Sequence, residues 1–515
     1  MNLTTDPWIP VVLHNGNPEL VSLKEAFARS AEITDLAVRP HERIALMRLL
    51  ICIAQAALDG PKDEEDWQKC KGRIIPAVPA YLDKWKSAFA LFGDGPRFLQ
   101  VRGIKKDASQ KPEDEEDEGK SVSKLDLALA TGNNSTLFDN AGGSNRPFTP
   151  AQLALMLLTF QCFSPGGLIG FVVWKGIKTL KTSAHAPCLA GNMLHTLVNG
   201  ENMSITIHQN MLAKHAVMRF AGENRWGVPV WEQFPQSFKD KAAVDNATMT
   251  YLGRLAPISR AILLNPDCSS MVLGNGLTYP SFEEWREPMA TIVVRKIKND
   301  EKRVTLSISL DKGVWRELHA LVVKAVDRTS NGGPLSLSHQ TTSNSMDLWV
   351  GGFVAKKAKP LDTSESVFHV PAAMFSSASQ NIYEHGVDWA QKLAGNLGRA
   401  VSAFHNNLGD KLDRREARDR AMAIKGKALR HYWTAAEGFL DLLFKVAETA
   451  SQSVSWENSE WGRKLWRARL DAYSYSCPHE TPRQMQAYAL GLKVLTGFQN
   501  VNNQEVDKED AHNEP

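Results

Sequence analysis

The chain has 515 residues, of which 43% are hydrophobic and 23% charged, and its formal net charge is +3. This length is too great for one hydrophobic core and predicts roughly two to four domains. The balance of hydrophobic and charged residues is that of a globular protein and excludes a chain that is disordered throughout.

The cysteines and the first residues indicate the cellular compartment. The six cysteines are scattered and form no Cys-x-x-Cys pair, so we expect reduced thiols and no structural metal site. The amino terminus, MNLTTDPWIPV, has neither the basic region nor the continuous apolar region of a secretory signal peptide. Together these features predict a cytoplasmic protein.

The first elements follow from local turn and capping signals. Asn15-Gly16 lies between the apolar runs WIPVVL and PELVSL, which predicts a β-hairpin. Ser22 and Glu25 have the spacing of a capping box and predict the start of a helix. A second helix is expected from about residue 42 to residue 58.

Two segments are strongly acidic. Residues 107–118 carry a net charge of −6 and residues 504–514 a net charge of −4, so the rest of the chain carries +13. We expect a mobile acidic loop at about residues 105–123 and a disordered acidic tail at residues 501–515. The basic remainder suits a phosphate-rich partner.

Residues 147–174 contain no fully charged side chain and are long enough to span a membrane. The sequence Ser164-Pro165-Gly166-Gly167 lies in the middle of this stretch. At that position each unpaired backbone group that faces lipid would raise the free energy by roughly several kcal/mol. We therefore predict a buried helix, a turn and a buried strand, and no membrane partner.

Capping signals support this prediction. Thr149, Pro150 and Gln152 form a capping box with proline at the first helical position, and LIGFVVW at residues 168–174 has the composition of a strand. Two explanations of the glycine pair remain open. The glycines lie either at the end of the helix, where a positive φ is needed, or in a loop that another group approaches closely.

The two halves of the chain have different textures. Up to residue 370, short strands such as 290–297 and 303–310 alternate with turns and helices, which predicts an α+β domain. From about residue 376 apolar residues recur three and four apart, and Thr481-Pro482 starts one helix. We predict a four-helix bundle over residues 371–500. Its expected helices lie around residues 389–404, 429–446, 461–468 and 485–495.

No catalytic signature stands out. Gly119-Lys120-Ser121 looks like the end of a phosphate-binding loop, but Asp114 occupies the position of the first glycine that such a loop requires. The sequences His-Glu-x-x-His, Gly-x-Ser-x-Gly and Gly-x-Gly-x-x-Gly do not occur. His185 and Cys188 are isolated in the sequence and are expected to be structural. We predict a protein that is not an enzyme and needs no cofactor.

Several short stretches together resemble one family. NLTTDPWIPV, LLICIAQAAL, GPRFLQ, LFDN, QCFSPGG and WVGGFVAKKAK occur in this order ahead of the predicted bundle. The chain resembles the CasA family, the large subunit of the type I-E CRISPR surveillance complex Cascade. The resemblance covers essentially the whole chain, and the order of the motifs makes it more specific than any one of them.

The resemblance implies two DNA-binding elements. The loop with Ser164, Gly166 and Gly167 would approach the minor groove of the protospacer-adjacent motif, where a side chain would hold the groove away. A wedge that helps to split the strands would lie at Lys356 and Lys357. The family often has an amide-bearing pair there, and lysine lacks the acceptor of an amide. A solvated basic turn is the alternative for these two residues.

Further contacts are expected with nucleic acid. By resemblance, Phe138 and Asn140 lie on a loop that meets the 5′ handle of the guide RNA, although a folded-back loop could instead bury Phe138 in the core. Lys175, Lys178 and Lys181 would share one face and hold phosphates if their segment is helical. If it is strand or coil, they are ordinary solvated lysines.

The resemblance implies a function in binding rather than bond cleavage. The chain would join a guide-RNA-loaded assembly with backbone, handle-binding and small subunits, sample double-stranded target DNA through the motif, and help to open the duplex. It would then help to recruit an effector helicase-nuclease. Two alternatives are a structural adaptor without motif readout and a metal-dependent nuclease.

Overall fold

The computed structural model describes residues 1–107, 119–129, 147–167, 169–179, 182, 184–297, 300–356, 358–409, 413–449 and 454–497. The chain divides into two compact units, which are described separately. The first comprises Met1–Val314 and Ala320–Val370, and the second comprises Trp315–His319 and the chain from Pro371 onward. The short segment Trp315–His319 joins the second unit, which the order of residues alone does not predict.

The first unit begins with the predicted hairpin. Strand β1 (Ile9–Leu13) pairs antiparallel with β2 (Pro18–Val21), and Gly16 in the turn has a φ of +80°. The other edge of β1 pairs with β3 (Ile33–Leu36). Helix α1 (Leu23–Ala28) starts at the predicted capping box of Ser22. These local predictions are confirmed because turn and cap geometry depend on adjacent residues only.

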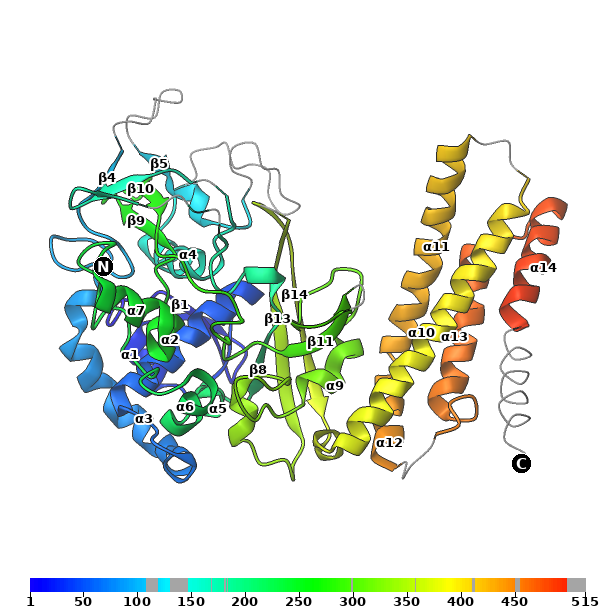
Figure 1. The fold of residues 1–515 in the computed structure, drawn as a ribbon, viewed down its shortest axis with the longest axis horizontal. Helices are drawn as coiled ribbons and strands as arrows, with labels where there is room; N and C mark the ends of the chain where they lie inside the picture. Colours follow the sequence, from blue (N-terminus) through cyan, green and yellow to red (C-terminus); the bar gives the residue numbers. More distant parts are fainter. Residues whose placement is uncertain are drawn as a thin grey trace. The chain divides into compact units, whose positions relative to one another are not determined.

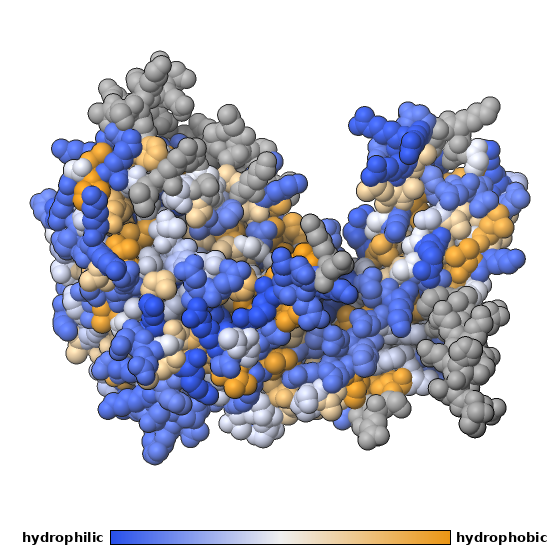
Figure 2. All heavy atoms as spheres, in the orientation of Figure 1, coloured by the Kyte–Doolittle hydropathy of each residue, from blue (hydrophilic) through white to orange (hydrophobic). Residues whose placement is uncertain are grey.

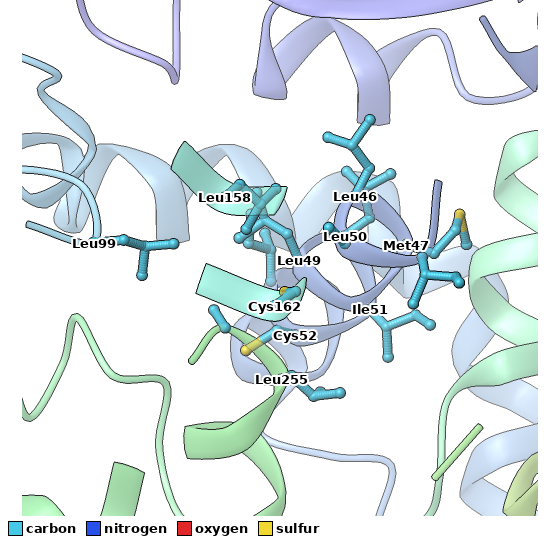
Figure 3. Close-up of a cluster of buried hydrophobic side chains, with 14 of the residues drawn as sticks. Leu46, Met47, Leu49, Leu50, Ile51, Cys52, Leu99, Leu158, Cys162 and Leu255 are labelled. Atoms are coloured by element: carbon cyan, nitrogen blue, oxygen red, sulfur yellow. The ribbon is translucent and has the colours of Figure 1, made fainter. Parts of the chain in front are cut away.

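Two helices form the centre of the first unit. In α2 (Pro40–Leu58) 14 of 19 residues are buried, and in α4 (Pro150–Phe163) 11 of 14 are buried. Helix α4 starts at the predicted capping box of Thr149, with Pro150 in its first turn. Leu49 and Cys52 of α2 lie beside Leu158 and Cys162 of α4 (Figure 3). Burial on all sides explains why residues 150–163 lack charge without crossing a membrane.

Within the described ranges no helix is long and apolar enough to span a bilayer. The predicted strand at residues 168–174 is shorter than expected, since β6 comprises only Val172–Trp174. The strand predicted at residues 303–310 is displaced, because β12 comprises Asp300–Thr305 and pairs with β11 (Ile292–Ile297). Hydrophobic runs predict that a strand exists better than they predict where its pairing ends.

The described strands of the first unit form five small sheets, and Figure 1 shows their arrangement around this centre. The sheets have the strand orders β2-β1-β3, β5-β10-β9, β11-β12, β14-β13-β8 and β4-β6-β7. Every pairing among the described strands is antiparallel, which confirms the α+β prediction. The helices and strands of this unit not yet given are α3 (Glu64–Lys84), β4 (Ile104–Lys106), β5 (Lys120–Ser121), β7 (Ile177–Lys178), β8 (His195–Asn199), α5 (Met203–Asn210), α6 (Lys214–Ala221), α7 (Lys241–Met249), α8 (Tyr251–Leu255), β9 (Arg260–Leu264), β10 (Ser270–Asn275), β13 (Met346–Lys356) and β14 (Lys359–Val370). The boundary between the two units falls inside the short helix α9 (Leu318–Leu321).

The second unit is helical, as predicted, but its described residues form five helices rather than the expected four. Helix α10 (Ser377–Asn406) packs against the other helices, and the side chains of Trp461 and Tyr432 are buried among them. The helix expected around residues 429–446 is divided at Gly438 and Phe439. The bounds of the other helices are α11 (Arg414–Glu437), α12 (Leu440–Thr449), α13 (Glu460–Ser476) and α14 (Pro482–Thr496). Helix α14 starts at the predicted capping box of Thr481.

Hydrophilic side chains cover most of the face shown in Figure 2, and the hydrophobic residues on it lie in separate patches. One group of charged side chains is nevertheless buried inside the first unit. The Glu287 carboxylate lies between two guanidinium groups, with Oε2 2.9 Å from Nη1 of Arg48 and Oε1 3.0 Å from Nε of Arg254. All three side chains are at most 2% exposed. The triad links α2, α8 and the segment ahead of β11.

This buried triad predicts a dependence of stability on pH. Burial alone would raise the pKa of Glu287, but the charges and hydrogen bonds of Arg254 and Arg48 outweigh burial and lower the pKa from 4.5 to about 2. A carboxylate with a lowered pKa in the folded state stabilises the fold above its unfolded pKa and loses this effect as the pH falls.

We therefore expect the difference in unfolding free energy between the native chain and Glu287→Gln to be constant above pH 4.5. It should shrink as the pH falls from 4.5 toward about 2, because the Glu287 carboxyl of the unfolded chain takes up a proton in this range while that of the folded chain is still ionised. Denaturant unfolding of both proteins at a series of pH values measures this difference. A difference that does not change over this range would contradict the assignment of the lowered pKa to Glu287.

Candidate nucleic-acid interface

The loop with the glycine pair begins where α4 ends. Ser164 caps the helix in a non-helical conformation, and its backbone N–H donates to the Phe160 carbonyl at 2.8 Å. The Ser164 side chain is fully buried, and its Oγ accepts a hydrogen bond from Nε of Arg260 at 2.8 Å. Ser164 therefore anchors the loop from inside. The contact with DNA predicted for it stays a prediction.

The two glycines lie beyond the helix end. Pro165 occupies the first position after the cap, where a glycine cap would stand, so the helix-end explanation of the glycine pair is wrong. Gly166 donates its backbone N–H to Nδ1 of His185 at 2.8 Å. Gly167 has a φ of +131°, a conformation that strongly favours glycine. The glycines thus shape a loop and do not end a helix.

This loop contacts the hairpin that carries the predicted wedge. A Cβ atom added to Gly167 would lie 3.4 Å from Cβ of Ala358, in the turn between β13 and β14. Lys356 is exposed and pairs with Lys359 across the hairpin. The motif loop and the wedge position, almost 200 residues apart in sequence, are therefore neighbours in space. Lys357 lies outside the described residues.

The strand leading to the hairpin turn is fixed from one side. The backbone N–H of Ala355 donates to Oδ1 of Asn192 at 3.0 Å, next to an irregularity in the pairing between Val354 and Ala355. The Asn192 carbonyl in turn accepts from the N–H of Ile308 at 2.9 Å. Nothing in the sequence around Asn192 signals this role, because its partners are more than 100 residues away.

The lysines after the glycine loop do not form the helical face that would hold phosphates. Lys175 and Gly176 form the turn between β6 and β7, with φ values of +49° and +77°. Nζ of Lys175 lies 3.3 Å from Oε1 of Gln236, and Lys178 forms an ion pair with Asp107. The helical premise is therefore wrong. Lys181 lies outside the described residues.

Two side chains that sequence reasoning did not connect with the loop hold it in place. Arg260 on β9 reaches the buried side of the loop, and His185 reaches Gly166. The segment with His185 runs antiparallel to the end of α4, since the Ala186 N–H donates to the Ser164 carbonyl at 2.9 Å. A histidine 19 residues from its partner gives no periodic signal, which is why it looked isolated.

The electrostatics of these two residues are unusual. Burial lowers the pKa of the Arg260 guanidinium to about 10. The pKa of His185 is lowered below 6.5, first by burial and then by the positive charge of Arg260. Among the ion pairs recorded for the described ranges, none includes Arg260. A positive charge without a carboxylate partner thus lies under the loop.

No group of three or more histidine, cysteine, aspartate or glutamate side chains in the described part of the chain could hold a metal ion.

The model of the family CRISPR-associated protein Cse1 matches residues 2–472. This chain belongs to the Cse1 family. The resemblance to CasA, another name of the same family, is thereby confirmed.

Individual relatives agree with this assignment. This Cse1-family chain is 27% identical over 520 residues to the CRISPR-associated protein CasA/Cse1 of Thermus thermophilus, which covers 96% of this chain and 95% of that protein. It is similar to a crystal structure of CasA from Thermus thermophilus, with a TM-score of 0.75, 22% identity and coverage of 96% and 98% of the two chains. Cse1 from Acidimicrobium ferrooxidans gives a TM-score of 0.71, 18% identity and 98% coverage of both chains.

A chain in a structure of a CRISPR RNA-guided surveillance complex is also similar, with a TM-score of 0.69, 18% identity and coverage of 96% and 99%. These structures show a shared fold over nearly the whole length. In this Cse1-family chain the predicted guide-RNA residues Phe138 and Asn140 lie outside the described residues, as do residues 108–118 of the acidic loop and the acidic tail. Their roles stay predictions.

Proposed function

We propose that this chain is the non-catalytic large subunit of a CRISPR RNA-guided DNA surveillance complex. In this role it recognises the protospacer-adjacent motif, promotes opening of the duplex and helps to recruit the effector helicase-nuclease. Membership in the Cse1 family and the fold shared with a chain of an RNA-guided surveillance complex support the proposal. The observation that carries it is the contact between the glycine loop and the β13–β14 turn at Gly167 and Ala358.

The proposed readout uses main chain rather than side chains. The bare backbone of Gly166 and Gly167 enters the minor groove, where the pattern of donors and acceptors is degenerate and several motif variants are accepted. In this proposal Lys356 and Lys357 act as a wedge beside the same base pairs. Motif contact and strand separation are thus coupled through one surface, and the guide RNA supplies most of the sequence information by pairing.

Other contacts complete the proposal. Phe138 and Asn140 meet the guide-RNA handle. The helical unit contacts the small subunits of the complex and the displaced strand. The surface exposed after target capture recruits the separate helicase-nuclease. These assignments rest on the family resemblance and on charge.

The proposal is tested by binding of the reconstituted guide-RNA complex to target duplexes that differ only in the motif, with and without this chain. We expect preference for motif-bearing DNA only when the chain is present. A chain that joins the complex without changing this preference would be a structural adaptor. Cutting of DNA by the purified chain with magnesium or manganese would instead identify a nuclease.

If Lys356 acts as part of the wedge, its side chain should affect the rate of strand separation. In the assembled complex we expect Lys356→Ala to slow strand separation by about tenfold, the effect of losing one charge-assisted hydrogen bond. A fluorescent base analogue next to the motif reports the opening. The exposed Lys71→Ala on α3 is the matched control and should open DNA at the native rate.

A different result would point to the solvated basic turn. If Lys356→Ala opens DNA at the native rate, the wedge assignment fails. If it weakens binding equally for all sequences and reduces the salt dependence by about one unit, Lys356 contacts only phosphate.

A further inference from the structure

The guanidinium group of Arg260 is surrounded by the glycine loop and its neighbours. Nε donates to Oγ of Ser164 at 2.8 Å, and Nη2 donates to the carbonyls of Pro165 at 3.0 Å and Ala184 at 2.9 Å. Nη1 donates to the carbonyl of its neighbour Ser259 at 3.2 Å. Arg260 is 2% exposed. The Arg260 side chain thus bonds to both ends of the segment that starts at Ser164 and ends at Ala184.

His185, which directly follows Ala184, holds the same loop through Gly166. Its Nδ1 lies 2.8 Å from the backbone nitrogen of Gly166. A backbone N–H can only donate, so Nδ1 must accept and must carry no proton. The imidazole is therefore neutral, with its proton on Nε2. A protonated imidazole carries N–H groups at both nitrogens and cannot make this bond.

We propose that Arg260 and His185 are positioning residues that hold the main chain of Gly166 and Gly167 in its DNA-binding shape, and that protonation of His185 releases the loop. This inference rests on the function proposed above. Arg260 fixes the path of the chain at Ser164 and Pro165. His185 then fixes the orientation of the Gly166 peptide, which is the group that approaches the groove.

The surroundings of His185 keep it in the required state near neutral pH. Burial and the positive charge of Arg260 both oppose protonation of His185. Arg260, on β9, is the charged side chain whose field acts on the imidazole. Because the pKa of His185 is lowered in the folded protein, the neutral form stabilises the loop at and above pH 6.5. This stabilisation is lost as the pH falls through the lower folded pKa.

The test compares motif-bearing and motif-free duplexes, bound to the fully assembled complex, from about pH 8 to about pH 5. We expect the native complex to lose motif preference toward the acid end. His185→Leu removes the acceptor and should lower the preference about fivefold at every pH. His185→Asn places Oδ1 as many bonds from the backbone as Nδ1 and cannot titrate, so it should keep the preference and show a flat pH profile.

Two further variants address Arg260. Arg260→Lys keeps the charge, but its donors share one nitrogen and cannot reach four acceptors, so we expect about a tenfold loss of motif preference. Ser164→Ala removes only one acceptor and should cost about threefold. If Arg260→Lys fails to fold, the motif preferences of Ser164→Ala, His185→Leu and His185→Asn test the positioning role instead. His14→Leu, at an exposed histidine far from the loop in sequence, is the control for the pH profile.

The outcomes separate this inference from the proposed function. If the native complex has no motif preference at about pH 7.5, the proposed function fails. If the native complex discriminates but His185→Leu matches it at every pH, the positioning role of His185 is overturned while the function stands. A His185→Asn variant with the native pH profile would overturn the protonation step.

Discussion

Replacing Gly166 by valine is expected to lower the preference of the assembled complex for motif-bearing DNA by about tenfold or more. The backbone of Gly166 lies outside the left-handed region, so its φ is one that valine can adopt. We expect the loss because the valine side chain would keep the main chain away from the minor groove. Equilibrium binding to duplexes with and without the motif measures the ratio.

Gly95→Val is the matched control for this variant. Gly95 also lies in a loop outside the left-handed region, and a Cβ there would meet nothing within 4 Å. We expect Gly95→Val to bind both duplexes like the native protein. If Gly166→Val assembles normally and discriminates as well as the control, close approach of the loop to DNA is not the source of motif preference.

Replacing Glu287 by glutamine is expected to destabilise the first unit by about 3–5 kcal/mol at neutral pH. The change leaves two buried guanidinium groups, Arg48 and Arg254, without their shared negative charge. Glutamine has nearly the same shape, so lost packing contributes little. Denaturant unfolding followed by circular dichroism measures the loss.

Glu284→Gln provides the comparison, since Glu284 is exposed and only three residues away. We expect a change within about 0.5 kcal/mol for this surface position. A loss below about 1 kcal/mol for Glu287→Gln would mean that the triad is not the buried ion network described here.

The sequence predicted those parts of the fold that depend on neighbouring residues. The caps at Ser22, Thr149 and Thr481 were predicted because each uses a side chain three residues from its partner. The turn at Lys175 was missed, although a lysine followed by glycine between two apolar runs could have indicated a hairpin rather than a helical face. The predicted phosphate face depended on that choice.

The candidate site was predictable only in part. The glycine pair signals an unusual backbone locally, and the family resemblance gave it a role. The contact between Gly167 and Ala358, and the support from Arg260, depend on tertiary packing across 95 or more residues. A buried arginine among apolar strand residues, as in Arg260-Ala-Ile-Leu-Leu, is the one sequence signal that could have pointed to the anchor.

A structure of the complete guide-loaded complex bound to motif-bearing duplex DNA tests the central claim most directly. We predict that main-chain atoms of Gly166 and Gly167 lie within hydrogen-bond distance of minor-groove base edges or sugars, with the β13–β14 turn beside the first separated base pair. A loop that stays packed against its own subunit, away from nucleic acid, would contradict the account.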